Sequence, residues 1–91
     1  MKLEIAMITL FVLVGMIGAC PDEGHEYLGF KDCGHNANSW NECATFCSNH
    51  DPCYYWTWNK DTTACCTMLK KNFKGKTVNE NIVSGNWACK Q

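Results

Sequence analysis

The sequence contains no arginine, and its formal net charge is only −1 at pH 7. Proteins that bind nucleic acids depend on a basic surface on which arginine makes bidentate contacts, so we expect no nucleic-acid partner. No second long apolar run follows residue 17, so we expect no membrane span in the mature protein. Residues 20–91 also lack an Asn-x-Ser/Thr sequon, so N-linked glycosylation is not expected.

Motifs of catalysis and metal binding are missing as well. There is no G-x-S-x-G or H-E-x-x-H sequence, and His25, His35 and His50 lie in polar segments. In an oxidising compartment an even set of cysteines is normally consumed in disulfide bonds, which leaves no thiolate as a nucleophile or zinc ligand. We therefore expect no enzyme activity, no catalytic residue, no metal site and no cofactor. The lack of repeats and of low-complexity sequence disfavours a structural matrix protein.

The N-terminus has the layout of a secretory signal peptide. Lys2 precedes an apolar run over residues 5–17, which ends in the small residues Gly18 and Ala19. The run is shorter than the roughly 20 apolar residues that a membrane-spanning helix requires. We expect a signal peptide over residues 1–19 and a secreted, extracellular domain over residues 20–91.

The same boundary permits a second interpretation, because Ile17-Gly18-Ala19-Cys20 also fits a bacterial lipobox, in which Cys20 carries lipid. Lipidation of Cys20 leaves an odd number of cysteines to pair, and Lys2 is the only lysine ahead of the apolar run. Both observations favour the signal peptide.

Eight cysteines lie in residues 20–91. A short secreted chain with more than roughly 8 to 10% cysteine is typically a disulfide scaffold. The reason is energetic, since so small a chain buries little apolar surface, and each disulfide adds about 2–4 kcal/mol by restricting the unfolded state. We expect one small domain in which every cysteine is paired.

A short helix is predicted to begin at Ser39. In the sequence Ser39-Trp40-Asn41-Glu42, the Ser39 hydroxyl can accept from the Glu42 N–H while Glu42 reaches back to the Ser39 N–H, as in a capping box. Polar residues over 48–52 supply the stop. An apolar stripe at i, i+3, i+4 and i+7 is formed by Trp40, Cys43, Ala44 and Cys47.

Aromatic and β-branched residues after the helix predict strands. Residues 53–58 place Trp56 and Trp58 on one face and Tyr55 on the other, and residues 64–69 return as a hairpin partner. A lysine-rich connection over 70–76 leads to a last strand around residues 82–83 and a tail at 87–89. Residues 21–38 are predicted to be loop around one short strand near Tyr27, Leu28 and Phe30. The expected fold class is small, disulfide-rich α+β, with one short helix packed on a small antiparallel β-sheet.

Local motifs in this order resemble the PAN/apple family over essentially the whole mature chain. The segment from Ser39 to Cys47 resembles the family's two-cysteine helix, and residues 51–58 resemble its "C-x-x-F-T-Y" strand. Residues 66–70 are similar to its "C-x-L-K", and 83–89 to its closing "S-G" and terminal cysteine. Leu69 departs from the family's lysine, which leaves the strand register open, and Cys33 and Cys65 are additional to the family's six cysteines.

The resemblance implies three disulfide bonds, Cys20–Cys89, Cys43–Cys66 and Cys47–Cys53, and leaves Cys33 and Cys65 to pair with each other. Independently of the family, neighbouring strand residues point to opposite faces, so Cys65 and Cys66 need separate partners. Cys66 shares a face with Met68, which we expect to lie against the helix. Sequence alone allows 105 pairings of eight cysteines.

The family resemblance implies a module that recognises an extracellular protein or glycan. This inference rests on analogy between folds. Tyr55 is a candidate anchor because exposed aromatic rings contact proteins and sugars well, whereas Trp40 and Trp56 are expected in the core. The lysines Lys70, Lys71, Lys74 and Lys76 are candidates for an anionic partner, although a solvated loop carries such charges for solubility alone. The alternative function is a venom or salivary toxin-like protein acting on a channel, a protease or a haemostatic target. The sequence does not identify the ligand or the oligomeric state.

Overall fold

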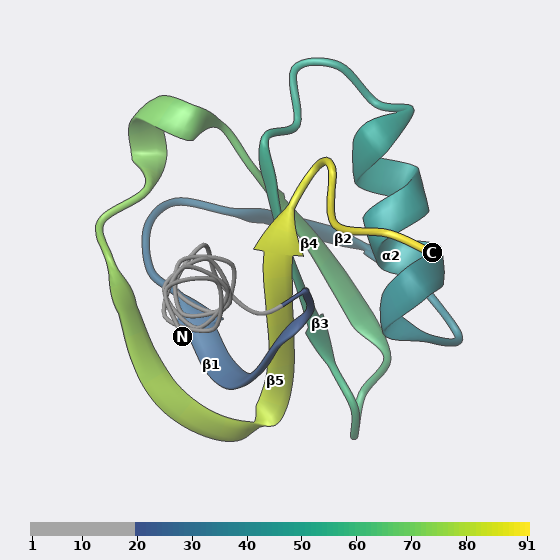
Figure 1. Cartoon of the computed structure of the whole chain (residues 1–91), viewed down its shortest axis with the longest axis vertical. Helices are drawn as coiled ribbons and strands as arrows, with labels where there is room; N and C mark the ends of the chain where they lie inside the picture. The colour runs from purple at the N-terminus through teal and green to yellow at the C-terminus, as the bar shows by residue number, and fades with distance from the viewer. Residues whose placement is uncertain (1–19) are drawn as a thin grey trace, which may run out of the picture.

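The computed structural model describes residues 20–91, and the expected signal peptide, residues 1–19, lies outside the described residues. Within these described residues, one α-helix packs on one face of a five-stranded sheet whose neighbouring strands are all antiparallel, in the order β1-β5-β3-β4-β2 (Figure 1). The fold is therefore the small, disulfide-rich α+β class that the sequence predicts. The elements are β1 (Asp22–Tyr27), β2 (Asp32–Asn36), α2 (Trp40–Ser48), β3 (Tyr55–Asn59), β4 (Ala64–Met68), the 3-10 helix η1 (Lys70–Asn72) and β5 (Lys76–Asn86).

The start of α2 follows the predicted cap with one change. The Ser39 Oγ accepts a hydrogen bond from the Glu42 N–H at 3.1 Å. The Glu42 carboxylate, however, accepts from the N–H of Asn38 at 2.8 Å, and not from that of Ser39. The Ser39 cap thus satisfies one otherwise unpaired donor of the helix, which begins at Trp40, and Glu42 fixes the residue just before the cap.

The face of the sheet toward α2 is built on two tryptophans. Trp56 in β3 is fully buried and stacks on Trp40, with ring centroids 5.8 Å apart and planes 8° apart. The Trp56 indole N–H donates to the Asn86 carbonyl at 2.9 Å, and that of Trp58 donates to Ala37 at 2.9 Å. The expectation that Trp40 and Trp56 fill the interface between helix and sheet is confirmed.

The opposite face of the sheet is covered too. Tyr55 of β3 packs edge-on against Tyr27, at 5.5 Å between centroids, and stacks on Phe73, at 4.7 Å. The Ser84 hydroxyl beneath them is buried and donates to the carbonyl of His25 at 2.8 Å. The central strands therefore have two buried faces instead of one.

Four disulfide bonds use every cysteine, and two of the four expected pairs are correct. The observed bonds are Cys20–Cys89, Cys33–Cys66, Cys43–Cys65 and Cys47–Cys53. The prediction exchanged Cys65 and Cys66. Cys65 lies opposite Trp58 in the β3–β4 pairing and so faces α2, whereas Cys66 lies opposite Thr57 on the other face. Met68 shares the Cys66 face and lies away from the helix, contrary to expectation.

The N-terminal part of the domain is also more regular than predicted. Instead of one short strand near residues 27–30, it forms two strands, β1 and β2, one at each edge of the sheet. At the other end, β5 begins six residues before the expected Ile82, because its first half pairs with β1. The 87–89 tail is a turn beyond the strand, held to α2 by the Gln91 N–H, which donates to Asn41 at 2.6 Å. No helix among residues 20–91 has the length and apolar character to cross a membrane.

Candidate ligand-binding site

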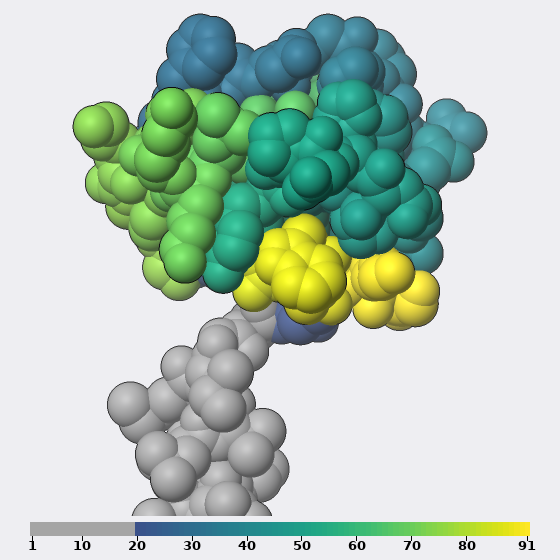
Figure 2. Space-filling view, turned by 90° about the horizontal axis from the view of Figure 1, so that it is seen from above, coloured from purple at the N-terminus to yellow at the C-terminus, as the bar shows by residue number. Residues whose placement is uncertain are grey.

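A surface hollow of about 320 Å³, here called the Trp87 groove, lies where the turn after α2 meets the end of β5. Figure 2 shows this face, with the C-terminal segment in yellow next to teal residues from the middle of the chain. The Cys47–Cys53 disulfide forms part of its wall. The side chains that carry its chemistry are Ser48, Asp51, Pro52, Tyr54 and Trp87.

The turn that shapes the groove is held at both ends. The helix stops at Ser48, the His50 N–H donates to the Cys47 carbonyl at 3.2 Å, and the Cys53 N–H donates to the His50 carbonyl at 2.8 Å. Together with the Cys47–Cys53 bond, which joins cysteines six positions apart, these contacts hold the turn as a rigid loop. Asp51 and Pro52 at its tip are exposed.

Trp87 lies on a fixed backbone although the residue is 48% exposed. Its N–H donates to the Tyr54 carbonyl at 2.7 Å, and the Tyr54 N–H in turn donates to the Met68 carbonyl at 2.9 Å. Two residues later, Cys89 is buried and bonded to Cys20. The backbone that carries this large aromatic side chain is thus held in place before any ligand arrives, so binding does not have to order the main chain here.

The polar groups of the groove are arranged for hydrogen bonding. The Ser48 hydroxyl donates to the Thr45 carbonyl at 2.8 Å, which leaves its oxygen lone pairs free to accept. Asp51 forms no ion pair with another described residue. The Lys70 ammonium lies 5.1 Å from the centroid of the Tyr54 ring, where it covers one side of that ring.

The predicted lysine cluster does not act as one patch. Lys70 lies over Tyr54, and the Lys76 ammonium donates to the Asp22 carboxylate at 2.8 Å. Lys71 and Lys74 are exposed, and neither has an acidic side chain within ion-pair distance among residues 20–91. Of the four lysines in the predicted cluster, Lys71 and Lys74 are the two with neither an acidic nor an aromatic partner among the described residues.

Tyr55, the predicted aromatic anchor, lies on the strand face opposite Trp56 but is partly buried. Tyr27, Tyr54 and Phe73 all contact its ring, at centroid distances of 5.5, 4.8 and 4.7 Å. The exposed ring of this cluster is Phe73, at 37%. A role for Tyr55 as a direct ligand contact stays a prediction, and its evident role is packing.

Asp22 ties β1 to β5 electrostatically. Burial by itself raises the pKa of the Asp22 carboxyl, but the hydrogen bond and charge of Lys76 outweigh burial and hold that pKa below its usual value. Tyr27 donates to the same carboxylate at 3.2 Å, and burial together with the Asp22 charge raises the pKa of the Tyr27 phenol well above its ordinary range. His25 lies 2.9 Å from the other Asp22 oxygen.

The remaining histidines pack against Phe46 of α2, His50 stacked on its ring and His35 tilted to it. The Phe46 ring lies 4.5 Å from that of His35 and 4.9 Å from that of His50. In the described part of the chain, no group of three or more histidine, cysteine or acidic side chains is placed to hold a metal ion.

Sequence reasoning missed Trp87 and Asp51 as groove residues. The available signal for Trp87 was its position after the last predicted strand, beside the polar residue Asn86 and not in an alternating strand pattern. Comparison of the chain with protein-family models, curated proteins and solved structures finds no match, so its resemblance to the PAN/apple family stays a prediction.

Proposed function

We propose that this protein is an extracellular, disulfide-stabilised binding module of PAN/apple type that recognises a carbohydrate through the Trp87 groove. The observation that carries the proposal is the pairing of a half-exposed tryptophan with polar groups in one preformed hollow. A pyranose ring stacks its C–H face on an aromatic surface, while its hydroxyls hydrogen-bond to side chains at the edge. Trp87 supplies the surface, and Asp51 and Ser48 supply the acceptors.

The compartment supports the same proposal. Four disulfide bonds with no free cysteine fit an oxidising, extracellular environment and a scaffold that resists unfolding outside the cell. Sugar recognition requires no catalytic group. A protein ligand on the same surface is the competing possibility, because exposed tryptophan and tyrosine are also common anchors in protein interfaces.

The test is a parallel binding screen of the oxidised protein, produced by secretion from the full chain, against a glycan array and a panel of extracellular proteins. We expect selective retention on the array and its loss in Trp87→Ala. The matched control is Val78→Ala, which removes another exposed apolar side chain, 77% exposed and outside the groove. If the protein binds extracellular proteins but no glycan on the array, carbohydrate recognition is contradicted and protein recognition is supported.

A second candidate, a toxin-like blocker of a channel, protease or haemostatic target, is favoured by one observation. Lys71 and Lys74 project from the η1 connection without acidic partners in the described residues, on a scaffold with four cross-links. Unpaired lysines attract acidic patches on a target. A Lys71→Gln/Lys74→Gln double variant that loses blocking or anticoagulant activity supports this candidate, and unchanged glycan binding by the same variant separates it from the first.

A further inference from the structure

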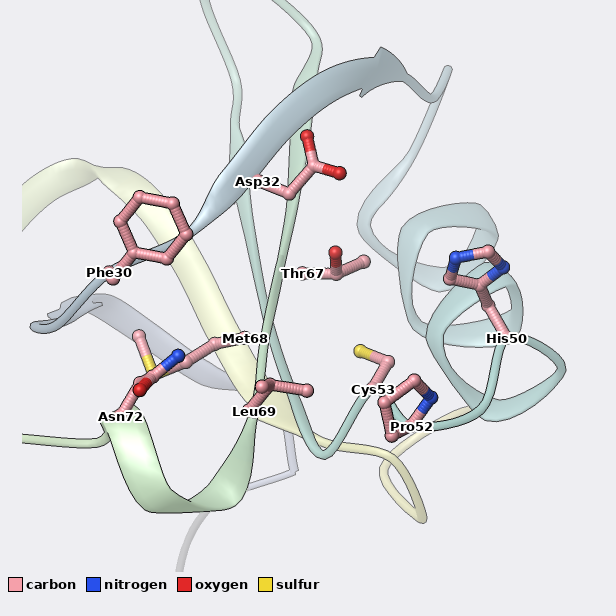
Figure 3. Close-up of a pocket in the computed structure, with 9 residues that line it drawn as sticks. All are labelled: Phe30, Asp32, His50, Pro52, Cys53, Thr67, Met68, Leu69 and Asn72. Atoms are coloured by element: carbon pink, nitrogen blue, oxygen red, sulfur yellow. The ribbon is translucent and has the colours of Figure 1, made fainter.

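A second hollow of about 190 Å³, here called the Phe30 pocket, adjoins the Trp87 groove. Pro52 and Cys53 line both, so the exposed Pro52 ring forms a ridge between them. In Figure 3, Phe30 lies at one side of the Phe30 pocket and His50 at the other, with Asp32 between them.

Phe30 is 78% exposed, yet the backbone just before it is fixed. The Leu28 N–H donates to Gly75, and the Leu28 carbonyl accepts from Lys74, both at 2.8 Å. Gly29 has φ +137° and packs directly on the carbonyl of Asn72, where any side chain would collide. The backbone that leads into Phe30 is therefore fixed, while the Phe30 side chain itself adds little to the core and stays accessible to a ligand.

Charge distinguishes the class of ligand. Each hollow contains one carboxylate, Asp32 in the Phe30 pocket and Asp51 in the Trp87 groove. No lysine of residues 20–91 lines either one, and the nearby Lys70 ammonium lies over the Tyr54 ring. Carboxylates accept hydrogen bonds from hydroxyl groups and repel sulfate or carboxylate groups, so both hollows favour a neutral ligand over an anionic one.

Size indicates the length of the ligand. Small-molecule sites usually occupy about 300–1,000 Å³, so the Phe30 pocket alone falls below this range and the Trp87 groove lies at its lower end. Joined across Pro52, the two hollows offer an extended site with an aromatic ring in each half. A single sugar ring fills only one of them.

We propose that the Phe30 pocket is a second subsite of the same binding site, and that the ligand is a neutral oligosaccharide of at least two units that crosses Pro52. The inference rests on the proposed carbohydrate function and adds to it the charge and minimum length of the ligand. Phe30 stacks on one unit and Trp87 on the other.

The experiment measures affinity for four neutral series, the mono- to tetrasaccharides of glucose, galactose, mannose and N-acetylglucosamine, with a heparin tetrasaccharide as the anionic probe. For the series that binds, the wild-type protein should prefer the tetrasaccharide over the monosaccharide by about tenfold. Phe30→Ala should abolish this preference while leaving monosaccharide affinity unchanged. Trp87→Ala should weaken binding of both the monosaccharide and the tetrasaccharide.

Two controls keep the result interpretable. Phe30→Tyr retains an aromatic ring and should bind the tetrasaccharide as the wild type does, and Val78→Ala should have no effect. Near-ultraviolet circular dichroism confirms that each variant keeps the wild-type packing.

Each other outcome overturns the inference in a recognisable way. Wild-type tetrasaccharide affinity in Phe30→Ala, with binding still dependent on Trp87, rejects the second subsite and leaves the proposed function standing. Tighter binding of the heparin tetrasaccharide than of every neutral tetrasaccharide rejects a neutral ligand. Absence of binding to every saccharide rejects both the inference and the proposed function.

Discussion

Gly85 of β5 faces the ring of Trp56 across the β3–β5 pairing. A Cβ atom added at Gly85 would lie 2.8 Å from Cζ2 of Trp56 and 3.2 Å from the Cβ of Cys89. The ring cannot retreat, because Trp56 is fully buried, stacks on Trp40 and donates to the Asn86 carbonyl. The absence of a side chain at residue 85 is therefore what permits the tryptophan to lie flat against the sheet.

The first prediction is that Gly85→Ala destabilises the fold by about 1–3 kcal/mol, the usual cost of overpacking a filled core. Urea denaturation followed by tryptophan fluorescence measures it. The matched control is Gly34→Ala in β2, where the new Cβ meets only the side-chain oxygen of Asp32 at 3.3 Å. Equal stability of the Gly85 and Gly34 variants would contradict the packing described for Trp56.

The second prediction concerns the start of α2. Ser39→Ala removes the acceptor of the Glu42 N–H and should lower the free energy of unfolding by about 1 kcal/mol. Ser39→Asp keeps an acceptor at the cap and should restore most of the loss. A Ser39→Asp variant no more stable than Ser39→Ala would show that the cap contributes little.

The helix was predictable because its signals are local. The Ser39 cap and the apolar stripe need only the sequence of one segment, and the observed helix runs over Trp40–Ser48 as the polar stop requires. The edge strands β1 and β2 escaped prediction because their sequences, DEGHEY and DCGHN, lack apolar alternation. They are strands because of pairing with β5 and β4, which is a long-range effect.

The exchange of Cys65 and Cys66 has a related cause. That the two point to opposite faces follows from strand geometry, but which of them faces α2 depends on the register of the β3–β4 hairpin, since a shift of one residue reverses every side chain. The position of Met68 does not identify the helix-facing side, because the sheet is covered on both faces and a buried methionine fits either face. Likewise, the Trp87 groove joins residues 47–54 to residue 87, a meeting that no local pattern encodes.

The third prediction tests the observed pairing. Stepwise reduction with alkylation and mass spectrometry should find Cys43 bonded to Cys65 and Cys33 bonded to Cys66. A Cys43–Cys66 species in the native protein would restore the family-like arrangement and contradict the register of β4.

The Cys43–Cys65 and Cys33–Cys66 bonds should contribute differently to the free energy of unfolding. Their sequence separations, 33 and 22 residues, imply loop-closure contributions within about 0.5 kcal/mol of each other. Cys43 and Cys65 are almost fully buried whereas Cys33 is exposed, so the double change Cys43→Ala/Cys65→Ala also leaves a cavity in the core. We expect it to cost more stability than Cys33→Ala/Cys66→Ala, as measured by thermal unfolding of the two variants.

The fourth prediction follows from the lowered pKa of Asp22. Because the folded pKa lies below the unfolded value of about 3.9, the charged carboxylate stabilises the fold fully above that value, and this contribution is lost as the pH falls through the folded pKa. Asp22→Asn should therefore lower stability at pH 7 by about 1–3 kcal/mol, through loss of charged hydrogen bonds from Lys76 and Tyr27. The difference from wild type should shrink between pH 5 and pH 2.

Unfolding midpoints in urea across that pH range provide the measurement. Glu23→Gln is the matched control, because Glu23 is an exposed neighbouring carboxylate on the same strand, outside the Lys76 ion pair. Lys76→Gln should reproduce part of the Asp22→Asn loss at pH 7, since Asp22 then keeps only the hydrogen bond from Tyr27 and the neighbouring His25. If the stability gap between wild type and Asp22→Asn is the same at pH 2 as at pH 7, the Asp22 charge does not join β1 to β5.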